Sequence, residues 1–161
     1  MITHATSRRP IDWKQAVHGG LLIAMGDALF AIAVWFEWNV AGLTRMFQSI
    51  AVGVLGKASY EGGATTALLG AGLHVAMAIA FVATCIALGF RYRLLLEKPV
   101  SSGLIYGLGL YVAMNFVVMP LSRVDASPSF EHLGTMAMSV AAHMLFGVTC
   151  TLFARRARRM D

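Results

Sequence analysis

The chain has 161 residues, of which 58 % are hydrophobic and 13 % are charged, and its formal net charge is +5. Soluble domains carry about a quarter charged residues, so this composition and a mean hydropathy of +0.69 exclude an ordinary soluble domain and indicate an integral membrane protein. The lysines and arginines gather beside the apolar segments, which predicts contact with lipid headgroups and no nucleic-acid partner.

Four apolar stretches are long enough to cross a bilayer, because a hydrocarbon core of about 30 Å requires about 20 helical residues. We expect an all-α fold, a transmembrane four-helix antiparallel bundle that forms a single membrane domain over residues 1–161. The polar N-terminal arm has no cleavable signal pattern, so we expect the first span to stay in the protein. The predicted spans are residues 16–36, 64–90, 101–121 and 133–153.

The segment between the first two spans is too polar to cross the bilayer. Apolar residues nonetheless recur there at spacings of three and four, from Leu43 to Val54, which is a helical stripe. This pattern predicts a short amphipathic helix over about residues 42–56 on the outer face of the bundle. Whether residues 40–60 lie flat or re-enter the membrane is left open by the pattern.

The distribution of basic residues predicts the orientation of the chain. Ten of the thirteen lysines and arginines lie in the N-terminal arm, in the connection between the second and third spans, or in the C-terminal tail. The remaining three, Arg45, Lys57 and Arg123, lie on the other side. Because cytoplasmic segments carry the excess of lysine and arginine, we expect both termini in the cytoplasm.

Small residues predict where the helices pack together. Gly103 and Gly107 form a GxxxG pair in the third span, and Gly70 lies in a row of small residues on the second. Small side chains allow two backbones to approach closely within lipid, where no hydrophobic effect joins helices. We therefore expect these three glycines at helix–helix contacts within the chain.

Polar side chains within the spans form the candidate site. Asp27, His74 and His143 each lie ten or eleven residues from the start of a predicted span, which places them about 15 Å deep, near the bilayer midplane. Asn115 lies on the third span, somewhat nearer the outer side. An isolated aspartate at the midplane costs at least about 2.5 kcal/mol, so we expect Asp27 to face the bundle interior, protonated or partnered by a histidine.

Several interpretations of these four residues stay open. Their side chains can hydrogen-bond across helices and fix the packing, or they can form a site for a proton or small cation. Two histidines and an aspartate can also ligate a transition metal, and His74 and His143 can hold a haem iron axially. The sequence has no HExxH motif, no paired carboxylates in one span and no Ser-His-Asp set, so we expect no catalytic residues and no enzyme.

Three segments carry a family resemblance: GDALFA, QSIAVGVLGKASYEGGATTALLGAGLH and YGLGLYVAMNFVVMPLSR. Through them, roughly residues 20–153 resemble a widespread set of small bacterial inner-membrane proteins with no assigned activity. The chain is more distantly similar to the family of an inner-membrane protein linked to acid resistance. The resemblance implies four spans in the bacterial inner membrane and implies no reaction.

Two classes of function follow as expectations. In the first, a homo-oligomer handles protons, a small cation or a small solute at the level of Asp27, His74 and His143. In the second, the chain is a structural or accessory subunit packed against a larger membrane complex. The near absence of soluble mass and the ten methionines, which are adaptable apolar side chains, suit the second class.

Overall fold

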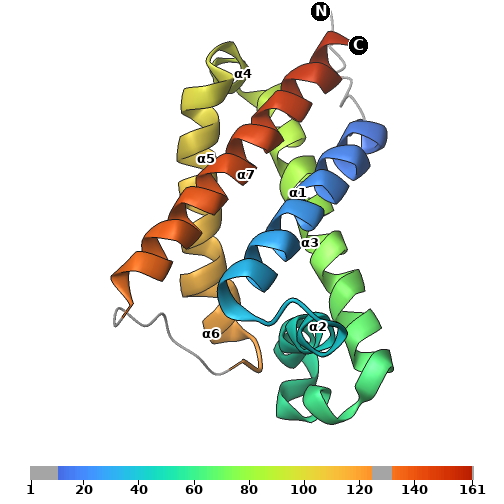
Figure 1. Cartoon of the computed structure of the whole chain (residues 1–161). Helices are drawn as coiled ribbons and strands as arrows, with labels where there is room; N and C mark the ends of the chain where they lie inside the picture. Colours follow the sequence, from blue (N-terminus) through green and yellow to red (C-terminus); the bar gives the residue numbers. More distant parts are fainter. Residues whose placement is uncertain (1–10, 125–131, 161) are drawn as a thin grey trace, which may run out of the picture.

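The computed structural model describes residues 11–124 and 132–160, and in these residues the fold is all-α (Figure 1). Four helices are long and apolar enough to cross a membrane, which confirms the predicted bundle of membrane-length helices. A shorter helix lies between the first two of them, also as predicted. The long helices are α1 (Trp13–Trp35), α3 (Gly63–Arg91), the continuous stretch Pro99–Leu121, and α7 (Leu133–Arg159).

The helix α7 is longer than the span predicted to end at residue 153. It continues through Arg159, and its last turns bury Ala154 and Ala157 in the core. Arginine side chains are compatible with this extension, because positive charge is favourable near the carboxyl end of a helix. The end of the apolar run therefore does not mark the end of the helix.

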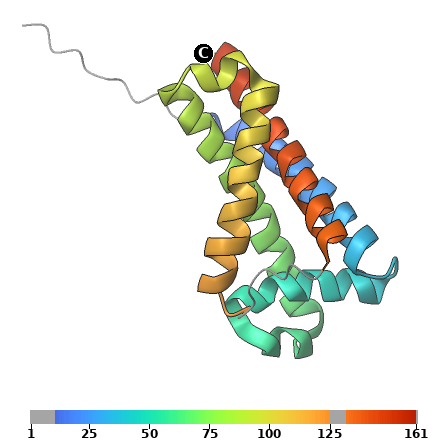
Figure 2. The same ribbon diagram turned by 90° about the vertical axis from the view of Figure 1, so that its left-hand side faces the viewer.

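Two helix pairs make up the bundle (Figures 1 and 2). The helix α1 packs mainly against α3, and α5 (Pro99–Ala113) packs mainly against α7. The helix α7 also contacts α1 and α3, and it thereby joins the two pairs. The core between the pairs includes Val82, Cys85 and Cys150, which are fully buried.

The α5–α7 contact is built on glycine. A Cβ atom on Gly103 would lie 2.5 Å from the Cα of Val148, and one on Gly107 would lie 2.6 Å from the Cα of Met144. On the other side of the contact, a Cβ on Gly147 would lie 2.5 Å from the Cα of Gly107. These separations are far below van der Waals distance, so only glycine permits this approach of the two backbones.

Glycines also set the contacts of α3. A Cβ on Gly70 would collide with the backbone carbonyl of Phe47 in the short helix α2 (Val40–Leu55). A Cβ on Gly20 of α1 would lie 2.7 Å from the Cα of Ile79. The sequence did not predict the role of Gly20, because its spacing does not distinguish it from the other glycines of the chain.

The helix α2 lies across the end of the bundle opposite the start of α1 and the end of α7 (Figure 2). It begins at Asn39, whose side chain accepts a hydrogen bond of 2.7 Å from the N–H of Gly42. In Figure 2 this helix runs across the end of the bundle and not between the long helices.

The 3₁₀ helix η1 (Gly56–Glu61) follows α2, and hydrogen bonds connect α2, η1 and the start of α3. The buried Gln48 amide donates to the carbonyl of Gly63 at 3.1 Å, and the Ser59 hydroxyl donates to the carbonyl of Gln48 at 3.0 Å. The Thr66 hydroxyl donates to the carbonyl of Ser59 at 2.6 Å. Gly63 has a φ of 56°, a left-handed conformation that glycine adopts readily.

The third span is not a uniform α-helix. Between α5 and α6 (Met119–Leu121), residues Met114–Val118 form a π-helical turn, η2, in which the N–H of Met119 bonds to the carbonyl of Met114. Pro120 explains this widening, because its ring lacks an N–H and crowds the carbonyl four residues earlier. The short helix α4 (Leu94–Glu97) precedes α5, in the basic connection between the second and third spans.

Candidate functional site

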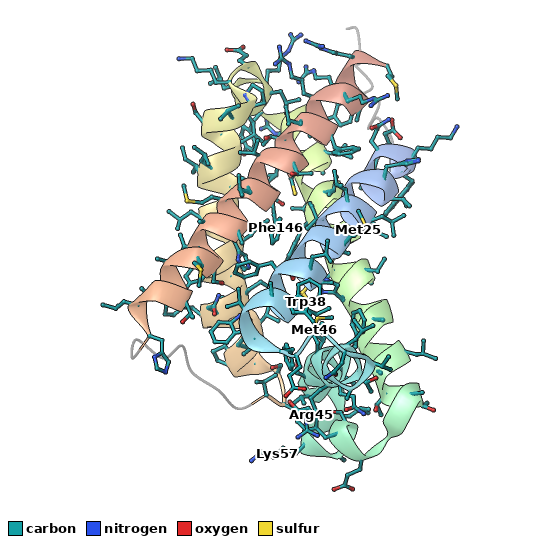
Figure 3. The ribbon with its side chains drawn as sticks, in the orientation of Figure 1. Met25, Trp38, Arg45, Met46, Lys57 and Phe146 are labelled. Atoms are coloured by element: carbon teal, nitrogen blue, oxygen red, sulfur yellow. The ribbon has the colours of Figure 1, made fainter. Side chains whose placement is uncertain are left out.

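A cavity of about 300 Å³ lies inside the bundle, and residues from α1, α2, α3, α7 and the third span line it. Its wall is mainly apolar and includes Met46 of α2 and Phe146 of α7, whereas Met25 on α1 is exposed on the outside (Figure 3). Asp27, His74 and His143 also line it. The structure thus places three of the four predicted polar side chains, each from a different helix, on the wall of one cavity.

His74 links α3 to α1. Its Nε2 lies 3.0 Å from the carbonyl oxygen of Ala24 and 3.8 Å from Oδ2 of Asp27. Because a carbonyl oxygen only accepts hydrogen bonds, Nε2 carries the proton in this arrangement and the neutral ring keeps a free lone pair on Nδ1. The ring is 14 % exposed, and the Asp27 side chain, which is 35 % exposed, is the more accessible of the two.

His143 is held in a fixed orientation on α7. Its Nδ1 donates to the carbonyl of Ser139 at 2.8 Å, so the lone pair of the neutral ring is on Nε2. The ring of Tyr111 packs edge-on against it at 5.5 Å between centroids, and the ring of Phe146 lies at 5.9 Å. Two aromatic neighbours and one backbone contact therefore leave Nε2 as the atom that can accept a proton.

Asn115 is not part of the cavity wall. Its amide Nδ2 donates to the carbonyl of Tyr111, four residues earlier on the same helix, at 3.0 Å. Asn115 lies in the π-helical turn, and this bond satisfies a carbonyl within its own helix. The structure thus separates Asn115 from the three titratable residues with which the sequence grouped it.

The sequence did not predict that residues of α2 line the cavity. Met46, Ser49 and Ile50 of α2 line the cavity, together with Trp35 and Phe36 at the end of α1. The periodicity of this segment predicted a helix with one apolar face. Periodicity does not indicate which surface covers that face, and here α2 lines the cavity that also contains Asp27, His74 and His143.

The titratable side chains of the cavity are one carboxylate and two imidazoles. Within residues 11–124 and 132–160, no group of three or more His, Cys, Asp or Glu side chains is arranged to hold a metal ion. The contact of 3.8 Å between Nε2 of His74 and Oδ2 of Asp27 is an ion pair only when the imidazole is protonated. A carboxylate and two imidazoles, each with an atom able to take up a proton, face one partly accessible space.

No protein-family model, curated protein or solved structure matches this chain. The family that the sequence resembles is therefore not identified by comparison. Of the properties that the resemblance implies, the structure supports four membrane-length helices. The polytopic membrane architecture and the cavity with its three titratable side chains are the basis for considering function.

Proposed function

We propose that this protein is a non-enzymatic membrane protein that exchanges protons through the cavity formed by Asp27, His74 and His143, and that it works as a homo-oligomer in the bacterial inner membrane. One observation supports the proposal above all: three titratable side chains from three helices face one cavity. Ionisable residues inside membrane bundles are costly, and they typically mark the paths of protons or ions.

A proton relay fits the atoms that face each other. When His74 takes up a proton on Nδ1, the resulting imidazolium can release its Nε2 proton to the Asp27 carboxylate, whose Oδ2 lies 3.8 Å away. The lone pair on Nε2 of His143 is the next acceptor on the cavity wall. The volume of about 300 Å³ has space for several water molecules at about 30 Å³ each, and these would carry the proton between the two sites.

The orientation that we propose places the start of α1 and the end of α7 in the cytoplasm. These two ends lie together in the structure (Figure 1). The basic residues of the described chain are concentrated at this end, which agrees with the enrichment of cytoplasmic segments in lysine and arginine. The basic residues at this end are Lys14, Arg91, Arg93, Lys98, Arg155, Arg156, Arg158 and Arg159. The opposite end has only three in the described chain, Arg45, Lys57 and Arg123.

Cysteine labelling in intact cells tests this orientation. A cysteine replacing Ala58, which is exposed in η1, should react with a membrane-impermeant maleimide added outside. A cysteine replacing Met160, which is 60 % exposed, should react only after the membrane is permeabilised. The native Cys85 and Cys150 are fully buried, so they should contribute no background. The reverse labelling pattern would invert the proposed topology.

Proton flux into liposomes tests the function. Purified protein should collapse a pH gradient, reported by an entrapped dye, and filling the cavity with Ala31→Phe should slow the flux at least tenfold without removing a titratable group. Ala31 lines the cavity, whereas Ala33 on the same helix is exposed on the outside, so Ala33→Phe is the matched control and should leave the flux unchanged.

Two results would count against the proposal. If the wild-type protein carries no more protons than empty liposomes, the cavity has no role in proton exchange. The mass of the detergent-solubilised protein gives the other test, since the proposal predicts several copies of this chain alone. A stoichiometric second protein would instead indicate an accessory subunit of a larger complex.

A further inference from the structure

A second pocket, of about 370 Å³, lies at the end of the bundle that holds the start of α1 and the end of α7. It is formed between α4 and the last turns of α7. Its lining residues are Arg93, Leu96, Glu97, Arg155, Arg158 and Arg159. None of these residues lines the cavity of Asp27, His74 and His143.

Four guanidinium groups and one carboxylate give this basic pocket a strong positive charge. Within the described part of the chain, no ion pair joins any of the four arginines to a carboxylate. Guanidinium groups are planar and present paired N–H donors, which match the oxygens of a phosphate group. The chemistry of the pocket is therefore that of a phosphate site.

The basic pocket is held in place by packing on both sides. Leu96 is 6 % exposed and packs on α3, where a Cβ on Gly89 would lie 3.0 Å from its methyl groups. The Nη1 of Arg158 donates to the carbonyl of Gly89 at 2.9 Å. These contacts hold α4 and α7 against the end of α3, and they place the arginines of both helices around one pocket.

Exposed apolar side chains lie next to the basic pocket in the sequence of both α7 and α4. Leu152 is 48 % exposed and lies one helical turn before Arg155, on the same side of α7. Leu94, at the start of α4, is 76 % exposed. A ligand that occupies both surfaces has a negative headgroup and hydrocarbon chains.

We propose that the basic pocket binds the phosphate headgroup of an anionic phospholipid, with the acyl chains lying along the exposed apolar side of α7. Basic pockets at the cytoplasmic ends of membrane helices recognise anionic headgroups in this way. A soluble phosphate compound would use the arginines equally well but would leave the adjoining leucines uncovered. Binding does not depend on the Asp27 cavity.

The test compares two arginines of the same helix turn. The full-length protein is reconstituted in nanodiscs of phosphatidylcholine with increasing phosphatidylglycerol, and lipid retention is measured by native mass spectrometry. Arg155→Gln should weaken phosphatidylglycerol binding about fivefold, from roughly 1 kcal/mol per basic residue. Arg156→Gln removes the same charge from a neighbouring residue that does not line the pocket, and it should have a clearly smaller effect.

Two further variants test whether residues at α4 contribute to lipid binding in the basic pocket. Arg93→Gln should weaken binding to a degree similar to Arg155→Gln, because both side chains line the basic pocket from opposite helices. Glu97→Gln removes the one carboxylate of the lining and should strengthen binding about fivefold. Thermal unfolding of each variant in phosphatidylcholine alone separates loss of binding from loss of fold.

Equal effects of Arg155→Gln and Arg156→Gln would overturn the proposal, because they would show a diffuse attraction between the basic surface and the bilayer. Complete displacement of phosphatidylglycerol by millimolar inorganic phosphate would also overturn it and would assign the basic pocket to a soluble phosphate. Retention of the lipid in the presence of phosphate supports the proposal.

Discussion

Replacement of Asp27 by asparagine should reduce proton exchange through the cavity at least tenfold while the bundle stays folded. Asparagine has the same shape as aspartate, and its Oδ1 still faces Nε2 of His74, but its amide accepts no proton near neutral pH. The substitution also removes an ionisable group from the membrane interior. We therefore expect the stability of Asp27→Asn to equal or exceed that of the wild-type protein.

The flux of Asp27→Asn is measured in liposomes at equal protein density and is compared with two other variants. Glu61→Gln makes the same chemical change at an exposed carboxylate in η1, outside the cavity, and should exchange protons at the wild-type rate. Asp27→Glu keeps a titratable group and should retain part of the activity. A folded Asp27→Asn variant with undiminished flux would remove Asp27 from the proton path.

Replacement of Gly107 by alanine should destabilise the bundle by about 3 kcal/mol. The added Cβ would lie 2.6 Å from the Cα of Met144 and would meet the backbone carbonyl of His143, so no side-chain rotation relieves the clash. The helices α5 and α7 must separate along a contact that also contains Gly103 and Gly147. Because His143 lies on this contact, the cavity should be distorted as well.

Gly109 provides the matched control for this variant. It lies on the same helix, and a Cβ there would have no neighbour within 4 Å. Gly109→Ala should therefore stabilise the helix by up to about 1 kcal/mol, which is the difference in intrinsic helix propensity. Unfolding of both variants in detergent, followed by circular dichroism, should show shifts of opposite sign. Equal stabilities would mean that α5 and α7 do not meet as the structure describes.

The architecture was largely predictable because it depends on length and composition. The apolar runs were long enough to span a bilayer, and the structure confirms four such helices and the short helix after the first. Details that depend on backbone geometry were not predictable. The π-helical turn Met114–Val118 is one example, since Pro120 near the end of a span predicts helix termination as readily as widening.

The sequence predicts a common depth for the titratable residues of the candidate site, but it does not predict the directions in which their side chains point. The rise of 1.5 Å per residue places Asp27, His74 and His143 at a common level from sequence alone. Which way each side chain points depends on the rotation of its helix, and close contacts such as Gly20 against Ile79 fix that rotation. Asn115 lies in a π-helical turn and bonds within its own helix, a local arrangement that the sequence did not predict.

The helix α2 gives the molecule a different width at its two ends. It lies across one end of the bundle and leaves Val40, Leu43 and Val54 exposed, while the described part of the opposite end carries the four-residue helix α4 (Figure 2). An amphipathic helix embedded at the boundary between headgroups and acyl chains occupies area in one leaflet. With α2 in that position only one leaflet would contain the added area, so we expect the protein to favour a membrane that bulges toward the leaflet containing α2.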